Sequence, residues 1–453
     1  MSHRSEGEYT LKLQAVAGRT MIRFPGYAVP VLIAAICLTA AVAPARAENW
    51  PSWRGPHMNG LSGETGLPTT WSPTEGVAWK LALPGAAGST PVIWGDQIFL
   101  TSADKNDLIL MAVTTAGKEQ WRIKLGSGDK AARGDEGNLA SPSPSTDGKH
   151  VWAFVGTGDL VCCTVAGKEV WRQDLQEKYG KFKIQFGMSS TPILYQGRLY
   201  LQLIHGEGDP KTREAKVVCL EADSGKQVWV QERPSEAHSE NEHSYASPTL
   251  YVDDKQAFLL THGADYVIAH RLEDGKELWR AGDLHPPGRY DPTLRLVASP
   301  VANEGLIIVP SAKGGQVLAL KPGGMGDITK SSEFRLWTWG RTPDVPSPII
   351  DHGLVYLCRE DGILICLDAK TGEKYYDNKR THAHRHRASP VLADGKIYIT
   401  SRDGVISVVK AGKEFELLSQ NKMDEDISAS PAISNGRIYL RGFQHLWAIG
   451  PAK

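Results

Sequence analysis

The stretch STPVIWGDQIFLTS, residues 89–102, decides the fold, because its pattern recurs along the chain. A Ser/Thr-Pro pair opens a short apolar segment, a tight turn follows, and a second apolar segment ends the copy. The other copies lie at residues 140–155, 190–203, 246–260, 298–311, 346–358, 388–401 and 429–442. Their repeated prolines are Pro91, Pro142, Pro192, Pro248, Pro300, Pro348, Pro390 and Pro431. Proline is tolerated where a strand opens, and Asp-Gly or Asn-Gly dipeptides suit hairpin turns. The pattern therefore predicts eight β-hairpins.

A second signature follows most copies and ends in an aromatic residue. Its clear forms are AGKEQW (116–121), AGKEVW (166–171), SGKQVW (224–229) and DGKELW (274–279). Weaker forms are TGEKYY (371–376) and AGKEF (411–415), whereas residues 314–339 keep one strand and a displaced Trp337 or Trp339. Together the two signatures predict four short antiparallel strands in each unit.

The two ends of the chain complement each other. The last unit offers three strands, near residues 431–434, 437–441 and 445–449, and residues 76–85 offer a fourth that contains Trp79. A ring that closes by pairing these ends leaves no free edge. Repeats of this size fit an all-β fold, an eight-bladed β-propeller of four-stranded antiparallel blades, closed by an N-terminal strand that joins the C-terminal blade. We expect this single domain to span residues 76–453.

Composition and charge exclude two classes of protein. The 453 residues include 51 Lys+Arg and 51 Asp+Glu, and 41% of them are hydrophobic. That hydrophobic share is ample for a packed core, so global disorder is excluded. The balanced charge gives no electrostatic basis for nucleic-acid binding, which usually relies on a basic surplus.

The start of the chain has the pattern of an export signal. An apolar run at residues 31–43 follows Arg23 and precedes Ala45-Arg46-Ala47, the order found in cleavable signal peptides. The run is shorter than the ~20 residues of a membrane-spanning helix. Residues 1–47 are therefore predicted to be a signal peptide, with Met21 the expected true start, and residues 48–75 a leader segment. We expect a periplasmic or secreted protein whose mature chain has no transmembrane segment.

The repeat resembles that of a known family. CLEADSGKQVW (219–229) and CLDAKTGEKYY (366–376) are similar to the repeat of the pyrroloquinoline-quinone-like (PQQ-like) propellers. NWPSWRGPHMNGLSGETGLPTTW (49–71) resembles the leader of exported bacterial members of that family. The resemblance covers about residues 76–449, and it implies one of two roles, because the superfamily includes both quinoprotein dehydrogenases and the BamB-type scaffold of outer-membrane protein assembly. One fold hosts both, so the repeat alone does not choose between them.

The cysteines are expected to be structural. Cys163, Cys219 and Cys366 recur at one repeat position, as small buried core side chains do. Cys358 should face about residue 363 across a tight turn, which disfavours a bridge to Cys366. The adjacent pair Cys162-Cys163 resembles the vicinal disulfide of some quinoprotein dehydrogenases, but successive strand residues point to opposite faces. We therefore expect no functional disulfide at that pair.

Histidines offer a weak metal alternative. His382, His384 and His386 alternate in RTHAHRHRASP, so an extended segment would align their imidazoles. Arg385 and Arg387 disfavour a cation there, and the plainer interpretation is a basic, solvated loop before a strand. His238 and His243 are also interpreted as loop residues, and no metal site is predicted.

Candidate binding residues lie four or five positions before the repeated prolines, where one blade crosses to the next. In a propeller these crossings gather at one mouth of the central channel, so polar groups there would converge. The candidates are Asn138, His243, Ser244, Arg295, Asp344, Arg385, His386 and Asp426. The alternative is a hydrated funnel without a specific ligand. The long crossings at residues 122–140, 172–190, 230–246 and 280–298 carry further charged and aromatic residues.

Three functions remain open from the sequence. The first is an exported, non-catalytic binding or scaffold propeller of the BamB type, a monomer without cofactor that contacts protein partners in the cell envelope. The second is a quinoprotein dehydrogenase, in which the quinone and a calcium ion would occupy the channel mouth. Asp344 or Asp426 would then be the carboxylate base, with Arg295 near the quinone oxygens. The third is carbohydrate binding through the aromatic loops. Bare repeats, and a sequence without the haem motif Cys-x-x-Cys-His, favour the first.

Overall fold

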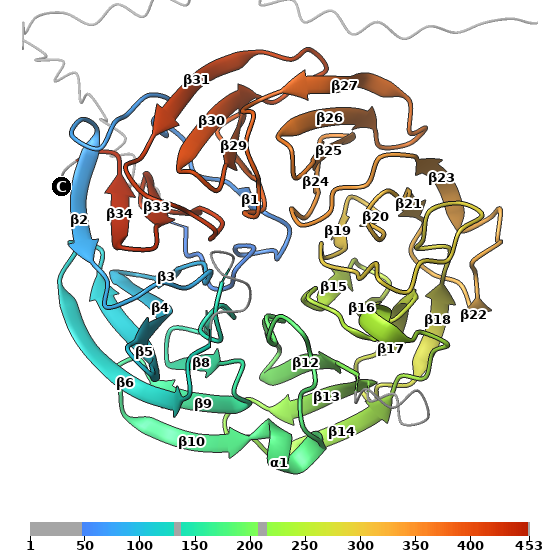
Figure 1. Cartoon of the computed structure of the whole chain (residues 1–453), viewed down its shortest axis with the longest axis horizontal. Coiled ribbons are helices and arrows are strands. Elements are labelled where there is room, and N and C mark those ends of the chain that lie inside the picture. Colours follow the sequence, from blue (N-terminus) through green and yellow to red (C-terminus); the bar gives the residue numbers. More distant parts are fainter. Residues whose placement is uncertain (1–47, 131–136, 207–214, 452–453) are drawn as a thin grey trace, which may run out of the picture. The chain divides into compact units, whose positions relative to one another are not determined.

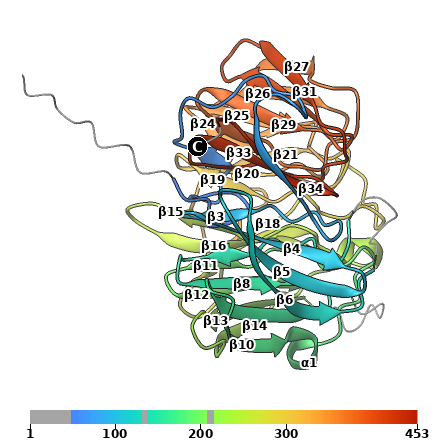
Figure 2. The same cartoon turned by 90° about the vertical axis from the view of Figure 1, so that its left-hand side faces the viewer.

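Eight β-sheets stand around a central axis and confirm the predicted eight-bladed propeller (Figure 1). The computed structural model describes residues 48–130, 137–206 and 215–451. The predicted signal peptide, residues 1–47, lies outside this range. Figure 2 shows the ring from the side, where β4, β5 and β6 of one blade run next to one another.

Each of the first four blades uses four consecutive strands, ordered from the axis outward. Blade 1 contains β3 (Val92–Trp94), β4 (Gln97–Asp104), β5 (Asp107–Thr114) and β6 (Glu119–Ser127). Blade 2 contains β7 (Ser145–Thr146), β8 (His150–Phe154), β9 (Asp159–Thr164) and β10 (Glu169–Asp174). Blade 3 contains β11 (Ile193–Tyr195), β12 (Arg198–Ile204), β13 (Ala215–Glu221) and β14 (Gln227–Glu232). Blade 4 contains β15 (Thr249–Val252), β16 (Ala257–Gly263), β17 (Tyr266–Arg271) and β18 (Glu277–Ala281), to which β22 (Gly326–Asp327) adds a parallel edge.

The next three blades follow the same order. Blade 5 contains β19 (Val301–Asn303), β20 (Leu306–Val309), β21 (Val317–Leu320) and β23 (Arg335–Trp339). Blade 6 contains β24 (Ile349–Asp351), β25 (Leu354–Cys358), β26 (Ile363–Asp368) and β27 (Lys374–Arg380). Blade 7 contains β28 (Val391–Ala393), β29 (Lys396–Thr400), β30 (Val405–Lys410) and β31 (Leu417–Lys422), and β1 (Leu61–Ser62) pairs with β28 in parallel.

Blade 8 closes the ring as the two chain ends predicted. Its inner strands are β32 (Ala432–Ser434), β33 (Arg437–Arg441) and β34 (His445–Ile449), and its outer strand is β2 (Val77–Ala82). β2 and β34 are antiparallel, with Lys80 opposite Trp447 and Leu81 opposite Leu446. The ring is therefore held shut by one antiparallel ladder between distant parts of the chain.

The hydrophobic core lies between neighbouring blades, so both faces of the middle strands are buried. Cys162 packs into the cluster between blades 2 and 3, whereas Cys163 packs into the cluster between blades 1 and 2. The two thiols thus point to opposite faces of β9, and all five cysteines of the described chain are free and buried. Cys358 lies opposite Leu364, and Cys366 lies opposite Tyr356, so these two cysteines do not face each other.

The recurrent tryptophans join consecutive blades. The outer hairpins of blades 1 to 6 and 8 have a register irregularity at the aromatic position, and such bulges re-aim side chains. In blade 7 the irregularity lies between Leu417 and Ser419, where no aromatic residue stands. The Trp79 indole donates to the carbonyl of Thr115 at 2.9 Å and lies over Gly117 of blade 1. Trp121, Trp171, Trp229 and Trp337 repeat this arrangement on Gly167, Gly225, Gly275 and Gly372. Of the two candidates in blade 5, Trp337 is the equivalent residue.

The leader crosses one end of the ring and ties distant blades together (Figure 1). The Trp50 N–H donates to Ile93 O at 2.8 Å, and the Ile93 N–H donates back at 2.7 Å. Arg54, which is buried, donates to the carbonyls of Pro348 and Pro390 at 2.6 and 2.9 Å. Burial lowers the pKa of Arg54 to about 9. The leader is therefore part of the packed propeller from Trp50 onward.

One alignment made from the sequence is wrong. In every other blade the first strand begins directly after the repeated proline, and in blade 2 that strand begins at Ser145. The equivalent proline is therefore Pro144, and Pro142 belongs to the crossing before it. The tandem Ser-Pro-Ser-Pro at residues 141–144 allowed both alignments, and strand pairing decided between them.

Helix is nearly absent from the described residues. One α-helix, α1 (Leu175–Tyr179), and one 3₁₀ turn at Ser239–Glu242 lie in crossings. Among residues 48–451, outside the two undescribed gaps, no helix has the length and hydropathy needed to span a bilayer.

Candidate functional site

A cavity of about 490 Å³ lies on the propeller axis, within the size range of small-molecule sites. Trp53 of the leader lines it together with the crossings between blades, and we call the end that the crossings line the mouth. Because residues from all eight inter-blade junctions contribute, we call this space the axial cavity.

A belt of eight hydroxyl groups surrounds the axial cavity. It consists of the Ser or Thr before each repeated proline: Thr90, Ser143, Thr191, Ser247, Ser299, Ser347, Ser389 and Ser430. All eight are buried. The backbone N–H of each of the first seven donates to the hydroxyl oxygen of the next blade at 2.9 to 3.1 Å. Inter-blade hydrogen bonds therefore fix the belt in place.

The mouth of the axial cavity carries charge on one side. Arg295, Lys313, Arg385 and Arg387 contribute four basic groups, and Asp344 and Glu360 contribute two carboxylates. Lys313 Nζ lies 3.2 Å from Glu360 Oε1 and 3.8 Å from Asp344 Oδ2. Burial, followed by the neighbouring Glu360, raises the pKa of Asp344. These charged residues all belong to the crossings and blades from 295 to 387, whereas the described residues of the opposite wall are neutral.

Four of the eight predicted residues line the axial cavity: Asn138, Arg295, Asp344 and Arg385. The Asn138 amide donates to Ala86 O at 2.7 Å. Arg295 Nη1 pairs with Glu240 Oε2 at 2.6 Å, and its guanidinium lies 4.5 Å from the centre of the Phe186 ring. The Arg385 carbonyl accepts the Arg402 N–H at 2.7 Å. Half of the residues that were chosen by their position before a repeated proline therefore line the same cavity.

The other four predicted residues have structural contacts instead. Ser244 is buried and donates to His262 O at 2.5 Å. His386 is buried with Nδ1 2.9 Å from His384 O, and burial lowers its pKa to about 4. His243 is half-buried, and its pKa is lowered chiefly by burial. Asp426 pairs with Arg402 Nη1 at 2.7 Å.

Sequence reasoning missed the belt, Trp53, Lys313 and Glu360. The belt residues were visible as the Ser/Thr of each Ser/Thr-Pro pair, but the pair was interpreted as a strand opening. Lys313 and Glu360 come from loops within blades 5 and 6 rather than from crossings. Only the ring geometry brings them to the mouth.

The axial cavity does not fit a quinone held by calcium. Calcium takes six to eight oxygen ligands, often carboxylates. The two carboxylates at the mouth both contact Lys313, which already supplies a cation there. Among the described residues, no group of three or more His, Cys, Asp or Glu is arranged to hold a metal ion. Cys162 and Cys163 lie in the inter-blade cores, away from the cavity.

The histidine-rich loop is anchored by a carboxylate. His382 Nε2 lies 3.1 Å from Asp403 Oδ2, and His384 Nδ1 lies 3.6 Å from Asp403 Oδ1. Lys422 Nζ lies 3.4 Å from the same carboxylate. The loop is therefore held to blade 7, and His386 turns inward rather than aligning with the other two imidazoles.

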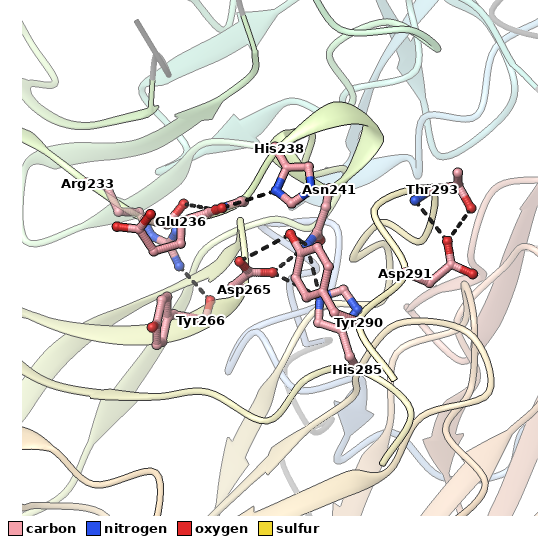
Figure 3. Close-up of polar contacts among 12 residues, drawn as sticks. Arg233, Glu236, His238, Asn241, Asp265, Tyr266, His285, Tyr290, Asp291 and Thr293 are labelled. Atoms are coloured by element: carbon pink, nitrogen blue, oxygen red, sulfur yellow. Dashed lines mark hydrogen bonds and ion pairs between the residues drawn. The ribbon is translucent and has the colours of Figure 1, made fainter. Parts of the chain in front are cut away.

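A second polar cluster fixes two long crossings against blade 4 (Figure 3). Asp265 lies in the turn between β16 and β17 with φ of 70°, a left-handed conformation that aspartate tolerates better than most residues. His285 Nε2 lies 2.9 Å from Asp265 Oδ1, and the Asn241 amide donates to the same carboxylate and to Tyr290 OH, the latter at 2.9 Å. Asn241 and Tyr290 come from the crossings at 230–246 and 280–298. The cluster thus gives these crossings a fixed relation to each other.

A comparison with protein families matches most of the chain. The family model described as outer membrane protein assembly factor BamB matches residues 164–325 and 328–452. A search of curated proteins finds no match.

Solved structures share the propeller at low sequence identity. BamB from Moraxella catarrhalis has 14% identity and a TM-score of 0.59, over 82% of this chain and 99% of that one. A quinohemoprotein alcohol dehydrogenase from Comamonas testosteroni has 12% identity and a TM-score of 0.65, over 89% and 81% of the two chains. A europium-containing methanol dehydrogenase has 12% identity and a TM-score of 0.67, over 88% and 90%. At these identities the likeness concerns the fold alone.

Proposed function

The chain belongs to the PQQ-like propeller family of the outer membrane protein assembly factor BamB, and on that basis we propose that it is an exported, non-catalytic binding propeller. It contacts protein partners of the cell envelope through the crossings around the axial cavity. The apolar run at residues 31–43 supports export, and the name of the matching family supports an envelope role. The proposed state is a monomer without a cofactor.

The observation that carries this proposal is the composition of the axial cavity. Its walls are hydroxyls, aromatic rings and charged side chains, and both of its carboxylates contact Lys313, which disfavours a calcium ion and the quinone it would hold. The crossings around it are fixed by Asp265, Asn241 and Arg295, so the mouth offers a preformed contact surface. Rigid surfaces lose less entropy on binding.

Charge reversal at the crossings tests the partner contact. The variant Lys181→Glu/Arg289→Glu changes two exposed residues of the crossings that also supply Phe186 and Arg295. We expect it to recover less envelope partner in a pull-down than the parent chain. The matched control Lys118→Glu/Lys168→Glu reverses two exposed lysines of the outer Gly-Lys turns and should recover the parent amount. Equal recovery by both variants would contradict the proposal.

An activity assay tests the alternative that the protein is a quinoprotein dehydrogenase. The dehydrogenases among the similar structures motivate it. Purified protein is mixed with the quinone and calcium, and dye reduction is followed with alcohols and sugars as substrates. We expect no reduction above the rate without protein. Substrate-dependent reduction that requires both additions would replace the binding role with an enzymatic one.

A further inference from the structure

Most belt hydroxyls still have a hydrogen that they can donate to a ligand. Each of the seven from Ser143 to Ser430 accepts a backbone N–H from the preceding blade. A hydroxyl that accepts one hydrogen bond still has its own hydrogen to donate. Within the described chain, none of these seven hydrogens has an assigned acceptor, and all seven side chains line the axial cavity. The belt therefore presents O–H donors to whatever enters.

The belt is preorganised for an oxygen acceptor. A proline follows every belt residue and restricts the backbone conformation of that residue. The inter-blade hydrogen bonds fix the position of the hydroxyl oxygens from Ser143 to Ser430. Burial removes most competing water, so a charged acceptor would gain more there than at an exposed surface.

Arg295 adds a fixed cation to the lining of the axial cavity. Glu240 Oε2 holds its Nη1 at 2.6 Å, and the rings of Phe186 and Tyr245 lie 4.5 and 5.9 Å from its guanidinium carbon. A guanidinium fork suits planar recognition of a carboxylate. Among the described residues, the four basic groups of the mouth outnumber its two carboxylates together with the Glu240 that pairs with Arg295, so this lining favours a negative guest.

We propose that the axial cavity is a receptor for a carboxylate group, which enters from the mouth and binds the belt hydroxyls with Arg295. This inference rests on the proposed function, because an acidic side chain or chain terminus of the partner would supply the carboxylate. A small free carboxylate offers the same chemistry.

Calorimetry with matched probes tests the chemistry and its source. The peptide probes are acetyl-Gly-Glu-Glu-Gly-amide and its isosteric partner acetyl-Gly-Gln-Gln-Gly-amide, and the small probes are succinate and succinamide. We expect each carboxylate to bind about tenfold more tightly than its amide and to bind more weakly as salt rises. Tight binding of the glutamate peptide alone assigns the site to a protein segment. Equal binding of succinate assigns it to a small acid.

Two variants connect the binding to named residues. Arg295→Gln should raise the dissociation constant of the carboxylate probe about tenfold. Ser347→Ala should weaken binding by a smaller factor, whereas Ser347→Thr keeps the hydroxyl and should bind like the parent chain. Lys168→Gln is the control, because this lysine is exposed, belongs to an outer Gly-Lys turn and lies outside the cavity lining. Near-ultraviolet circular dichroism verifies that each variant keeps its packing.

Several results would overturn the carboxylate receptor. One is equal affinity for glutamate and glutamine peptides; another is no binding of any probe to correctly packed protein. Unchanged affinity in Arg295→Gln is a third. If Arg295→Gln and Ser347→Ala still recover the envelope partner fully, the partner does not supply the carboxylate, and the scaffold role stands. If the carboxylate probes bind but no envelope partner is recovered, the carboxylate receptor stands and the scaffold role is wrong.

Discussion

At the residue scale, the most unusual groups are ionisable side chains buried inside blade 4. His262 is buried, and within the described residues neither of its ring nitrogens has a hydrogen-bond partner. Burial, aided by the nearby Arg233, lowers its pKa to about 3. Burial also lowers the pKa of His270 to about 4. These imidazoles are neutral in the folded protein at the pH values where an unfolded histidine becomes charged.

Acid should therefore destabilise the protein through His262. An unfolded histidine has a pKa of about 6.5, so unfolding takes up a proton as the pH falls from that value toward the folded pKa. The stability that neutral His262 contributes is complete above about pH 6.5 and is lost below it, at about 1.4 kcal/mol per pH unit. Replacement by His262→Leu removes this proton uptake. We expect urea unfolding between pH 6 and 4.5 to show a flatter loss of stability in the variant than in the parent chain.

A surface histidine provides the control for this titration. His57 is exposed, so His57→Gln is the matched substitution of a histidine outside the core. The backbone groups of residue 262 bond to Gln202 and Ser244 and are kept in His262→Leu. Parallel curves for His262→Leu and the parent would show that this imidazole is not the group that takes up the proton.

At the element scale, neighbouring blades are joined by an indole packed on a glycine. Gly372 has φ of 74°, and a Cβ placed there would lie 2.6 Å from the Trp337 ring. Gly353 of the same blade has φ of 72°, but a Cβ there would meet nothing within 4 Å. The two turns therefore share backbone conformation and differ in the docked ring.

Alanine substitutions at Gly353 and Gly372 separate the free-energy cost of backbone strain from the cost of lost packing between blades. Gly353→Ala should cost about 1 kcal/mol of unfolding free energy, because alanine disfavours positive φ. Gly372→Ala should cost a further ~1–3 kcal/mol, because the methyl displaces Trp337 from its contact. Urea unfolding measures both values, and tryptophan fluorescence should shift in Gly372→Ala only. Equal losses in the two variants would mean that the indole contact contributes nothing beyond the turn.

At the scale of the whole molecule, one ladder decides whether the ring is closed. β2 is the outer strand of blade 8, and its partner β34 lies near the other end of the chain. Without β2, the edge of β34 is exposed, and unpaired edges promote association. Trp79, which joins blades 8 and 1, would be lost with it.

Removal of residues 48–83 should open the ring, and addition of these residues as a separate peptide should close it again. A chain that begins at Pro84 is expected to elute as larger species and to unfold at lower urea concentration than the chain from Glu48. A peptide of residues 48–83 added in trans should restore the elution volume of the longer chain. The control peptide carries the same residues with 76–83 in scrambled order. Unchanged elution and stability in the shortened chain would show that closure does not depend on β2.

The architecture was predictable because it rests on local patterns. Each Ser/Thr-Pro hairpin and each Gly-Lys-aromatic turn carries its own strand and turn signals, so eight copies predict eight blades. The closing strand was also visible, because β2 kept the tryptophan of the repeat. The second copy was misaligned at Pro142, since two prolines satisfied the same local rule and only strand pairing could select Pro144.

The site depended on tertiary structure. Asn138, Arg295, Asp344 and Arg385 meet at the axial cavity, but His386 and Ser244, in the same sequence positions, turn into the core. The belt hydroxyls accept hydrogen bonds from neighbouring blades, and Arg54 reaches carbonyls 294 and 336 residues away. Sequence periodicity reports which face of a strand is buried, a property of near neighbours. Convergence at the axis depends on how long crossings pack between blades, and that is determined by contacts among residues far apart in the chain.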